Sequence, residues 1–256
     1  TLSGSATTAS LCTVGNITAE YGYPATVLDT RAQAAWAVVY AQIVLYDMFD
    51  PLDVIAPFEV LAAGALAVGG DLTVQLVSAG GPGPVVSGTQ DLALTAAGLL
   101  DPTKAGYLVI PGASGPIAGD PDDGVDTIPV RLARTLETEL IPLLHKAFAN
   151  SGLTVATVCG GSTLLAMAGL IEGRHATTHH LGLDVLDAAG VNAVAARVVD
   201  DGDLVSAGGV TSGLDLALYL LERSYGPRVA HAVEELFEYE RRGVVWKPSG
   251  HRPQEF

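Results

Sequence analysis

The stretch TVATVCGGSTLLAMAGL, residues 154–170, decides the fold. Its apolar, β-branched run Thr154–Val158 ends at Cys159 and two glycines, and the residues that follow have the apolar spacing of a helix. The pattern predicts a buried strand, a tight turn and a helix, with Cys159 in the turn. A nucleophile in such a turn points away from the sheet, and small residues after it let a substrate approach the backbone. The alternative interpretation is an ordinary buried cysteine before a glycine turn.

The same alternation of short strand-like runs and helical stretches continues through the chain from Val38, which predicts an α/β fold. Strands are predicted at Ile43–Tyr46, Thr73–Ser78, Leu92–Thr95, Tyr107–Ile110, Thr154–Val158, His175–Thr178, Ala196–Val199 and Leu204–Ala207. Helices are predicted at Pro57–Val68, Ile128–Ala149, Ser162–Leu170, Leu181–Ala189, Thr211–Ser224 and Pro227–Phe237. Aspartates and a glycine between the last two strands indicate a hairpin.

Composition limits the possible partners. The chain has 256 residues, 49% of them hydrophobic, and a formal net charge of −15 from 28 acidic and 13 basic residues. This excess of acid repels phosphate backbones and anionic lipid, so we expect neither nucleic acid nor a membrane as partner. No apolar run reaches the roughly 18 residues of a membrane helix. The two cysteines, Cys12 and Cys159, form no disulfide framework, and we interpret both as free thiols.

The chain divides into a short amino-terminal region and one large domain. Residues 1–37 are rich in Ser, Thr, Ala and Gly and are predicted to form an arm. Residues 38–246 form the predicted α/β domain, and residues 247–256 a carboxy-terminal tail. The loop at residues 112–126 is long for this architecture.

Three predicted loops lie at carboxyl ends of strands, where ligands bind in open α/β sheets. Asp53 stands just before a helix that we expect to begin at Pro57. The sequence PGASG at residues 111–115 exposes backbone amides, and Cys159 follows the third strand. A carboxyl, a set of amides and a thiol are therefore predicted to converge in one cleft. The alternative interpretation of Asp53 is a helix cap.

The residues after Cys159 bear on its ionisation. The amides of Gly160 and Gly161 are expected at a helix N-terminus, where they favour thiolate over thiol and could hold a developing anion. Three histidines, His175, His179 and His180, cluster nearby. Because no cysteine cluster or helical H-E-x-x-H pair accompanies them, no metal site is predicted.

Four segments together resemble the ThiJ/PfpI superfamily, and most of all its isonitrile hydratase branch. They are VCGGSTLLAMAGLIEGRHATTHH at 158–180, PLDVIAPFEVL at 51–61, LVIPGASG at 108–115 and SAGGVTSGLDLALYLLE at 206–222. The resemblance implies a flavodoxin-like three-layer sandwich with a mostly parallel sheet, a cysteine on a nucleophile elbow, and a homodimer. It favours a cytoplasmic protein, although the arm leaves secretion open.

The resemblance also assigns roles to individual residues. It implies Cys159 as nucleophile and Asp53 as the acid that faces the sulfur, with a small-molecule substrate and no cofactor. The implied binding pocket comprises Gly112, Ala113, Gly160, His179, Thr211 and Ser212. His179 has the alternative of a hydrogen-bonded structural residue.

One departure from the branch concerns the residue after the nucleophile. Relatives there carry threonine, whose hydroxyl is thought to take part in the reaction, and this chain has Gly160. Ala113 stands where relatives have a second glycine, so it is expected to narrow the pocket. Three functions stay open: hydration of isonitriles, another thiol-dependent reaction such as that of a glyoxalase or amidase, and a thiol sensor without turnover.

Overall fold

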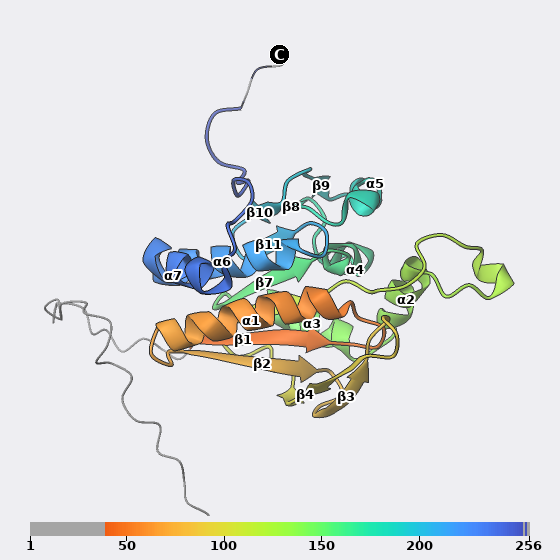
Figure 1. The fold of residues 1–256 in the computed structure, drawn as a ribbon. Coiled ribbons are helices and arrows are strands. Elements are labelled where there is room, and N and C mark those ends of the chain that lie inside the picture. Colours follow the sequence, from red (N-terminus) through yellow and green to blue (C-terminus); the bar gives the residue numbers. More distant parts are fainter. Residues whose placement is uncertain (1–38, 253, 255–256) are drawn as a thin grey trace, which may run out of the picture. The chain divides into compact units, whose positions relative to one another are not determined.

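A computed structural model describes residues 39–252 and 254 (Figure 1). Its centre is a seven-stranded sheet with the order β10-β11-β7-β6-β1-β2-β5, parallel throughout except for β10. The strands are β1 (Val39–Leu45), β2 (Leu72–Ser78), β5 (Gly98–Leu99), β6 (Gly106–Ile110), β7 (Leu153–Val158), β10 (Val198–Asp200) and β11 (Leu204–Ala207). The predicted arm and Cys12 lie outside the described residues.

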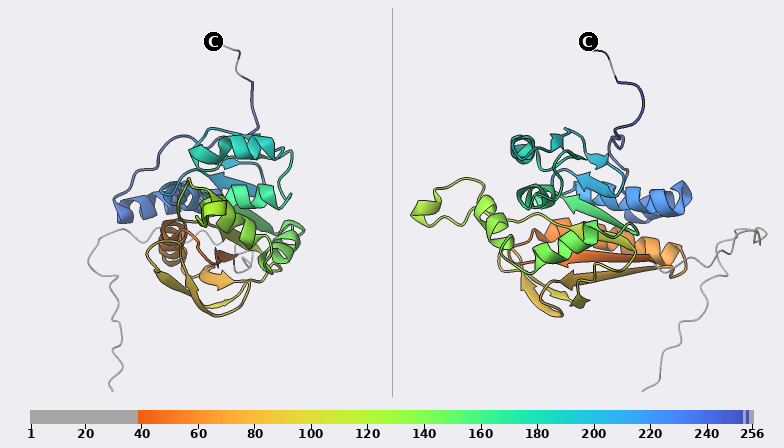
Figure 2. Two further views of the ribbon diagram at one scale, coloured as in Figure 1. Left: turned by 90° about the vertical axis from the view of Figure 1, so that its right-hand side faces the viewer. Right: turned by 180° about the vertical axis from the view of Figure 1, so that it is seen from behind.

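Helices cover both faces of this sheet, which gives three layers (Figures 1 and 2). Helices α1 (Pro51–Ala67), α6 (Ser212–Tyr225) and α7 (Pro227–Phe237) pack together on one face. Helices α3 (Leu140–Phe148) and α4 (Gly161–Met167) lie on the other. The smaller elements are α2 (Ile128–Thr135), α5 (Leu183–Ala188), the 3-10 turns η1 (Pro121–Asp123) and η2 (His180–Gly182), and two short ladders. The flavodoxin-like class predicted from the sequence is confirmed.

The two ladders pair strands outside the main sheet. Strand β3 (Gly83–Val86) pairs antiparallel with β4 (Ala93–Ala96), and β8 (His175–Ala176) pairs parallel with β9 (Asn192–Ala193). Three short strands, β3, β5 and β9, were not predicted. The hairpin before Leu204 is confirmed, because β10 and β11 pair antiparallel.

The predicted start of the first helix at Pro57 is wrong. Helix α1 begins at Pro51, and the side chain of its N-cap residue Asp50 accepts a hydrogen bond of 2.9 Å from the amide of Leu52. Both prolines suit a first helical turn, so the sequence alone did not separate them. Pro57 is accommodated inside the helix, with its ring beside Gly213 of α6, where a Cβ would lie 3.1 Å from Pro57 Cδ.

The single helix predicted over Ile128–Ala149 is also wrong, because it is divided into α2 and α3. Thr138 Oγ1 donates to the carbonyl of Thr135 at 2.7 Å and accepts from the amide of Leu140 at 3.4 Å. Such local side-chain bonds compete with the helical ladder. The strand predicted at His175–Thr178 ends at Ala176, since the amide of Thr177 bonds instead to Ser206 Oγ at 2.9 Å.

The core explains where the site lies. Large side chains of the central strands are fully buried, among them Ile43, Leu45, Leu108 and Ile110. Strands β1, β6 and β7 are neighbours, and the chain turns to opposite sides of β1 when it forms β2 and β6. Crevices at such switch points open beyond the carboxyl ends of the strands. The loops after β1, β6 and β7 therefore meet at one edge.

Candidate active site

Cys159 lies in a strained turn between β7 and α4. Its φ is +54°, in the left-handed region that residues with a Cβ rarely adopt. The turn is held from two sides: the Cys159 amide donates to the carbonyl of Gly208 at 2.8 Å, and its carbonyl accepts a 2.7 Å bond from Thr178 Oγ1. The side chain is a free thiol, almost entirely buried. This is the geometry of a nucleophile elbow.

Two glycines beside Cys159 are required by close backbone contacts. A Cβ on Gly161 would lie 2.3 Å from the carbonyl oxygen of Ile110, and one on Gly112 would lie 2.6 Å from the amide nitrogen of Gly160. Gly160 itself has helical φ and ψ of −66° and −3°, and its Cβ would lie 3.5 Å or more from its neighbours. The backbone therefore needs glycine at 112 and 161, but not at 160.

Asp53 lies in the first turn of α1 and is fully buried. It does not cap the helix, because Asp50 does. Asp53 Oδ2 instead accepts a 2.9 Å hydrogen bond from the amide of Gly112. In the described part of the chain, Oδ1 has no partner that meets hydrogen-bond geometry, although the Cys159 thiol is near enough to act on the carboxyl as a donor. One oxygen of Asp53 is thus fixed, and the other is left for the thiol.

Both groups of this pair hold their protons strongly. Burial, and then the nearby Asp50 charge, raise the pKa of Asp53 well above its usual value. Burial and the charge of Asp53 raise the pKa of Cys159 to about 12, against the opposing effect of the Gly160 and Val210 amides. The Gly160 amide lowers the pKa of the thiol, as expected, but desolvation raises it by more. At neutral pH the pair carries at most one negative charge.

The amides near the sulfur differ from those expected. The amides of Gly160 and Val210 lie near enough to the Cys159 sulfur to lower the pKa of the thiol. The Gly112 amide is engaged by Asp53. Sequence reasoning missed Val210, although it lies in the predicted GGVTSG loop directly before Thr211. The family resemblance of this segment indicated Thr211 and Ser212, whereas Val210 contributes its backbone amide.

The remaining predicted pocket residues differ in their burial and in their contacts. Ala113 is buried, and its nitrogen would lie 3.9 Å from a Cβ on Gly160. Thr211 is exposed and its hydroxyl accepts a 3.1 Å bond from Arg197. Ser212 is buried at the start of α6.

His179 caps η2 and packs on the loop that carries Val210. Its Nδ1 accepts a 3.3 Å bond from the amide of Leu181, and its Cδ2 would lie 3.0 Å from a Cβ on Gly209. Burial and the adjacent His180 lower its pKa, so the ring is neutral near pH 7. Among residues 39–252 and 254, no three His, Cys, Asp or Glu side chains gather closely enough to hold a metal ion.

Tyr46 is a further side chain of the site that the sequence did not reveal. It follows β1, is buried, and its hydroxyl donates a 2.9 Å bond to the carbonyl of Pro111. Burial raises the pKa of this phenol well above its usual value, and the charges of Asp53, Cys159 and Asp50 add to the shift. Tyr46 therefore holds the loop that presents Gly112.

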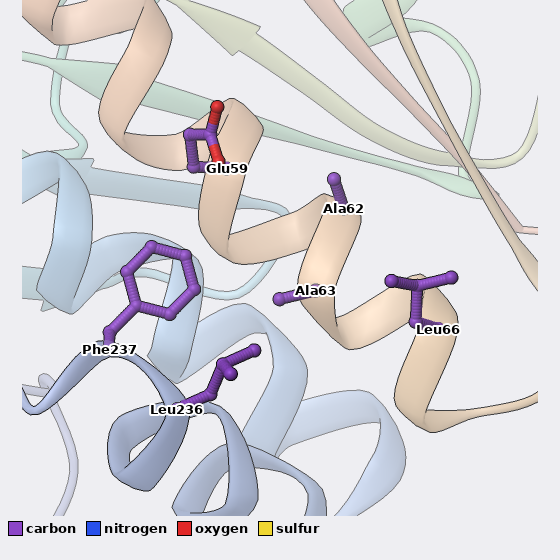
Figure 3. A pocket seen from close by; sticks show the side chains of 6 residues that line it. All are labelled: Glu59, Ala62, Ala63, Leu66, Leu236 and Phe237. Atoms are coloured by element: carbon purple, nitrogen blue, oxygen red, sulfur yellow. The ribbon is translucent and has the colours of Figure 1, made fainter. Parts of the chain in front are cut away.

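A groove of about 300 Å³ lies elsewhere, between α1 and α7 (Figure 3). Its lining is apolar apart from one carboxyl and consists of Glu59, Ala62, Ala63, Leu66, Leu236 and Phe237. It contains neither Cys159 nor Asp53, because Asp53 lies in the first turn of α1 and the groove begins at Glu59. We do not assign the chemistry to this groove.

The fold and the cysteine elbow are similar to those of the DJ-1/PfpI family. The DJ-1/PfpI family model matches residues 130–223. In structure, the chain is similar to a ThiJ/PfpI family protein from Pseudomonas syringae, with a TM-score of 0.65 and 22% identity over 86% of this chain and 85% of that one. At that identity the likeness shows the fold alone.

Two curated relatives differ in their described functions. The chain is 44% identical over 85 residues to isonitrile hydratase of Pseudomonas putida, which is 33% of this chain and 37% of that protein. It is 30% identical over 165 residues to the HTH-type transcriptional regulator CdhR of Pseudomonas aeruginosa, 64% of this chain and 44% of that protein. The chain thus matches less than half the length of these relatives.

Proposed function

We propose that the protein hydrates isonitriles to N-substituted formamides, with Cys159 as nucleophile and Asp53 as acid and base. The observation that carries this proposal is the pairing of a thiol on a strained elbow with a buried carboxyl that has one unpaired oxygen. The similarity to isonitrile hydratase of Pseudomonas putida supports it.

A proton held by the pair fits the first step of this reaction. Cys159 sulfur adds to the terminal carbon of R–N≡C, and the proton shared with Asp53 goes to that carbon, which gives the thioimidate R–N=CH–S–Cys159. Water then adds to the same carbon, and Asp53 takes one of its protons. Collapse breaks the C–S bond and releases R–NH–CHO, with a proton returned to nitrogen and one left on the pair. The sum is R–N≡C plus H₂O to R–NH–CHO.

Backbone amides stabilise the sulfur each time it carries negative charge. The Gly160 and Val210 amides lower the Cys159 pKa, so they favour both the attacking thiolate and the leaving thiolate. Ala113 lies beside Gly160, where its methyl group would limit the width of the substrate. We assign no catalytic side chain to Thr211, whose hydroxyl is bonded to Arg197, and we place His179 and Ser212 among the residues that shape the surrounding loop.

A second candidate is a binding or sensing role without turnover. Two observations favour it: Gly160 supplies no hydroxyl beside the sulfur, and the similarity to the regulator CdhR covers more of this chain than the similarity to the hydratase. A third candidate keeps the thiol reactive toward another electrophile, such as a small aldehyde or amide.

The assembly is a separate part of the proposal. We propose a homodimer, as the family resemblance implies, to be tested by light scattering on the purified chain. The reaction above uses only Cys159, Asp53 and water, so it calls for no cofactor. None of the helices in residues 39–252 is long and apolar enough to cross a membrane.

The test is turnover of an aliphatic isonitrile, with formamide followed by mass spectrometry. The parent protein is compared with Cys159→Ala, Asp53→Asn and, as a matched control, Asp47→Asn, which changes an exposed carboxyl in the loop between β1 and α1. Formamide made by the parent and by Asp47→Asn, but not by the other two, is the expected result. Equal formamide from Cys159→Ala would sink the proposal. No formamide from the parent, with Cys159 still open to alkylation, would favour the other two candidates.

A further inference from the structure

Asp50 is a second carboxyl at the candidate site, and neither the sequence pattern nor the proposed reaction gives it a role. Its Oδ1 accepts from the Leu52 amide at 2.9 Å and so caps α1. Its own amide donates to the Gly112 carbonyl at 2.8 Å. Gly112 in turn donates its amide to Asp53. Asp50 and Asp53 are therefore both bonded to Gly112, one to its carbonyl and the other to its amide.

The arrangement is a capping box into which Gly112 has been inserted. In an ordinary box, the carboxylate three residues after the cap accepts a bond from the amide of the cap residue. Here Asp53 is three residues after Asp50, but Gly112 stands between them: its carbonyl takes the Asp50 amide, and its own amide goes to Asp53. Residues three apart lie on one face of a helix. The two carboxyls are thus neighbours that share one glycine.

The charges that raise the pKa values of this pair and its neighbours are those of acids. Asp50 raises the pKa of Asp53, which lies on its own helix, of Cys159 in the turn after β7, and of Tyr46 at the end of β1. The loop after β6 contributes the Gly112 amide, and the loop before α6 contributes the Val210 amide. Asp50 is only partly buried, and its negative charge acts on a pair that must not gain a second negative charge.

We propose that Asp50 is a positioning residue that seats Gly112 against Asp53, and that its negative charge keeps one proton on the Asp53–Cys159 pair. This inference rests on Cys159 and Asp53 being the reactive pair. It predicts that loss of the Asp50 charge lets the thiolate form at lower pH, even when the helix cap is kept.

The test measures the rate of alkylation of Cys159 by iodoacetamide between about pH 7 and pH 12, and the midpoint is fitted from the rise of this rate toward the thiol pKa of about 12. The Cys159 peptide is followed by mass spectrometry, which separates it from Cys12. The variant is Asp50→Asn, because asparagine caps a helix as well as aspartate does, and Asp47→Asn is the control. We expect Asp50→Asn to move the midpoint about half a pH unit lower, or to raise the rate below it about threefold. The Asp47→Asn profile should match the parent.

A structural effect alone would not give this pattern. Asp50→Ser also caps without charge, so it should shift the midpoint as Asp50→Asn does, with the melting temperature unchanged in both. High salt should reduce the difference from the parent, because it screens a partly exposed charge. Midpoints equal to that of Asp47→Asn in both variants would overturn the proposal. The assay contains no isonitrile, so a shifted midpoint upholds the role of Asp50 even if no formamide is ever found.

Discussion

Replacement of Gly160 by threonine tests the site residue that departs from the isonitrile hydratase branch. The backbone at 160 is already helical, and a Cβ there would lie 3.5 Å from Gly112 Cα and 3.7 Å from Leu132 Cδ1, which are ordinary contacts. Glycine replaced at a compatible position stabilises a fold by roughly 0.4–1 kcal/mol, since the unfolded chain loses freedom. For a domain of this size we expect a melting temperature about 1–3 °C higher.

The effect on turnover follows from the hydroxyl that threonine adds. A hydroxyl directly after Cys159 can donate to an atom that gains charge during addition, and one such hydrogen bond contributes about 1–1.5 kcal/mol. This corresponds to a rate of formamide formation about tenfold higher. Gly160→Ala is the matched control, because it adds the Cβ without the hydroxyl. It should reproduce the gain in stability but leave the rate unchanged.

The assay combines thermal unfolding with the rate of formamide release at saturating isonitrile. Equal rates for Gly160→Thr and Gly160→Ala would refute the role given to the hydroxyl. A large loss of stability in Gly160→Ala would refute the geometric argument. Gly161→Ala sets the opposite limit: its Cβ would lie 2.3 Å from the Ile110 carbonyl oxygen, so it should unfold at clearly lower temperature.

Three further predictions concern the pair and its support. Asp53→Asn should abolish formamide formation. It should also raise the free energy of unfolding at neutral pH by about 1 kcal/mol, because a buried carboxyl with a raised pKa is costly to keep ionised. A melting curve checks this, and a less stable variant would contradict it. The raised pKa of Cys159 contributes stability below the unfolded thiol pKa that is lost as pH rises toward about 12; the alkaline slope of the unfolding free energy should therefore be shallower in Cys159→Ala. Thr178→Val removes the donor to the Cys159 carbonyl, which should cost about 1–2 kcal/mol in denaturant unfolding and slow alkylation, whereas an unchanged midpoint would show that the elbow is held otherwise.

Sequence patterns predicted the elements that carry the site better than the connections between them. The β-branched residues before Cys159 and the two glycines after it predict a strand followed by a turn. Strand β7 and helix α4 begin within one residue of the predicted starts. Helix α1 failed because Pro51 and Pro57 give the same local signal, and only packing against α6 allows the second inside the helix.

The residues missed at the site act through contacts that a sequence does not encode locally. Val210 contributes an amide, for which any residue type would serve. Tyr46 was placed at the end of a predicted strand, but its bond to Pro111 spans 65 positions. Asp53 had the alternative role of a helix cap, but the structure gives that role to Asp50 and bonds Asp53 to the Gly112 amide. Composition predicted the kinds of groups present, whereas long-range backbone contacts determined which of them are in use.

The raised pKa of Cys159 bears on the choice between turnover and sensing. A redox-sensing cysteine reacts as an accessible thiolate of low pKa, and Cys159 is buried with a pKa of about 12. A thiol that keeps its proton at rest is protected from oxidants. When sulfur and a proton both add to the carbon of a neutral electrophile, the thiol proton is used in the reaction. Such an addition avoids a thiolate beside the negative charge of Asp53. Addition to an isonitrile therefore fits this pair better than oxidation does.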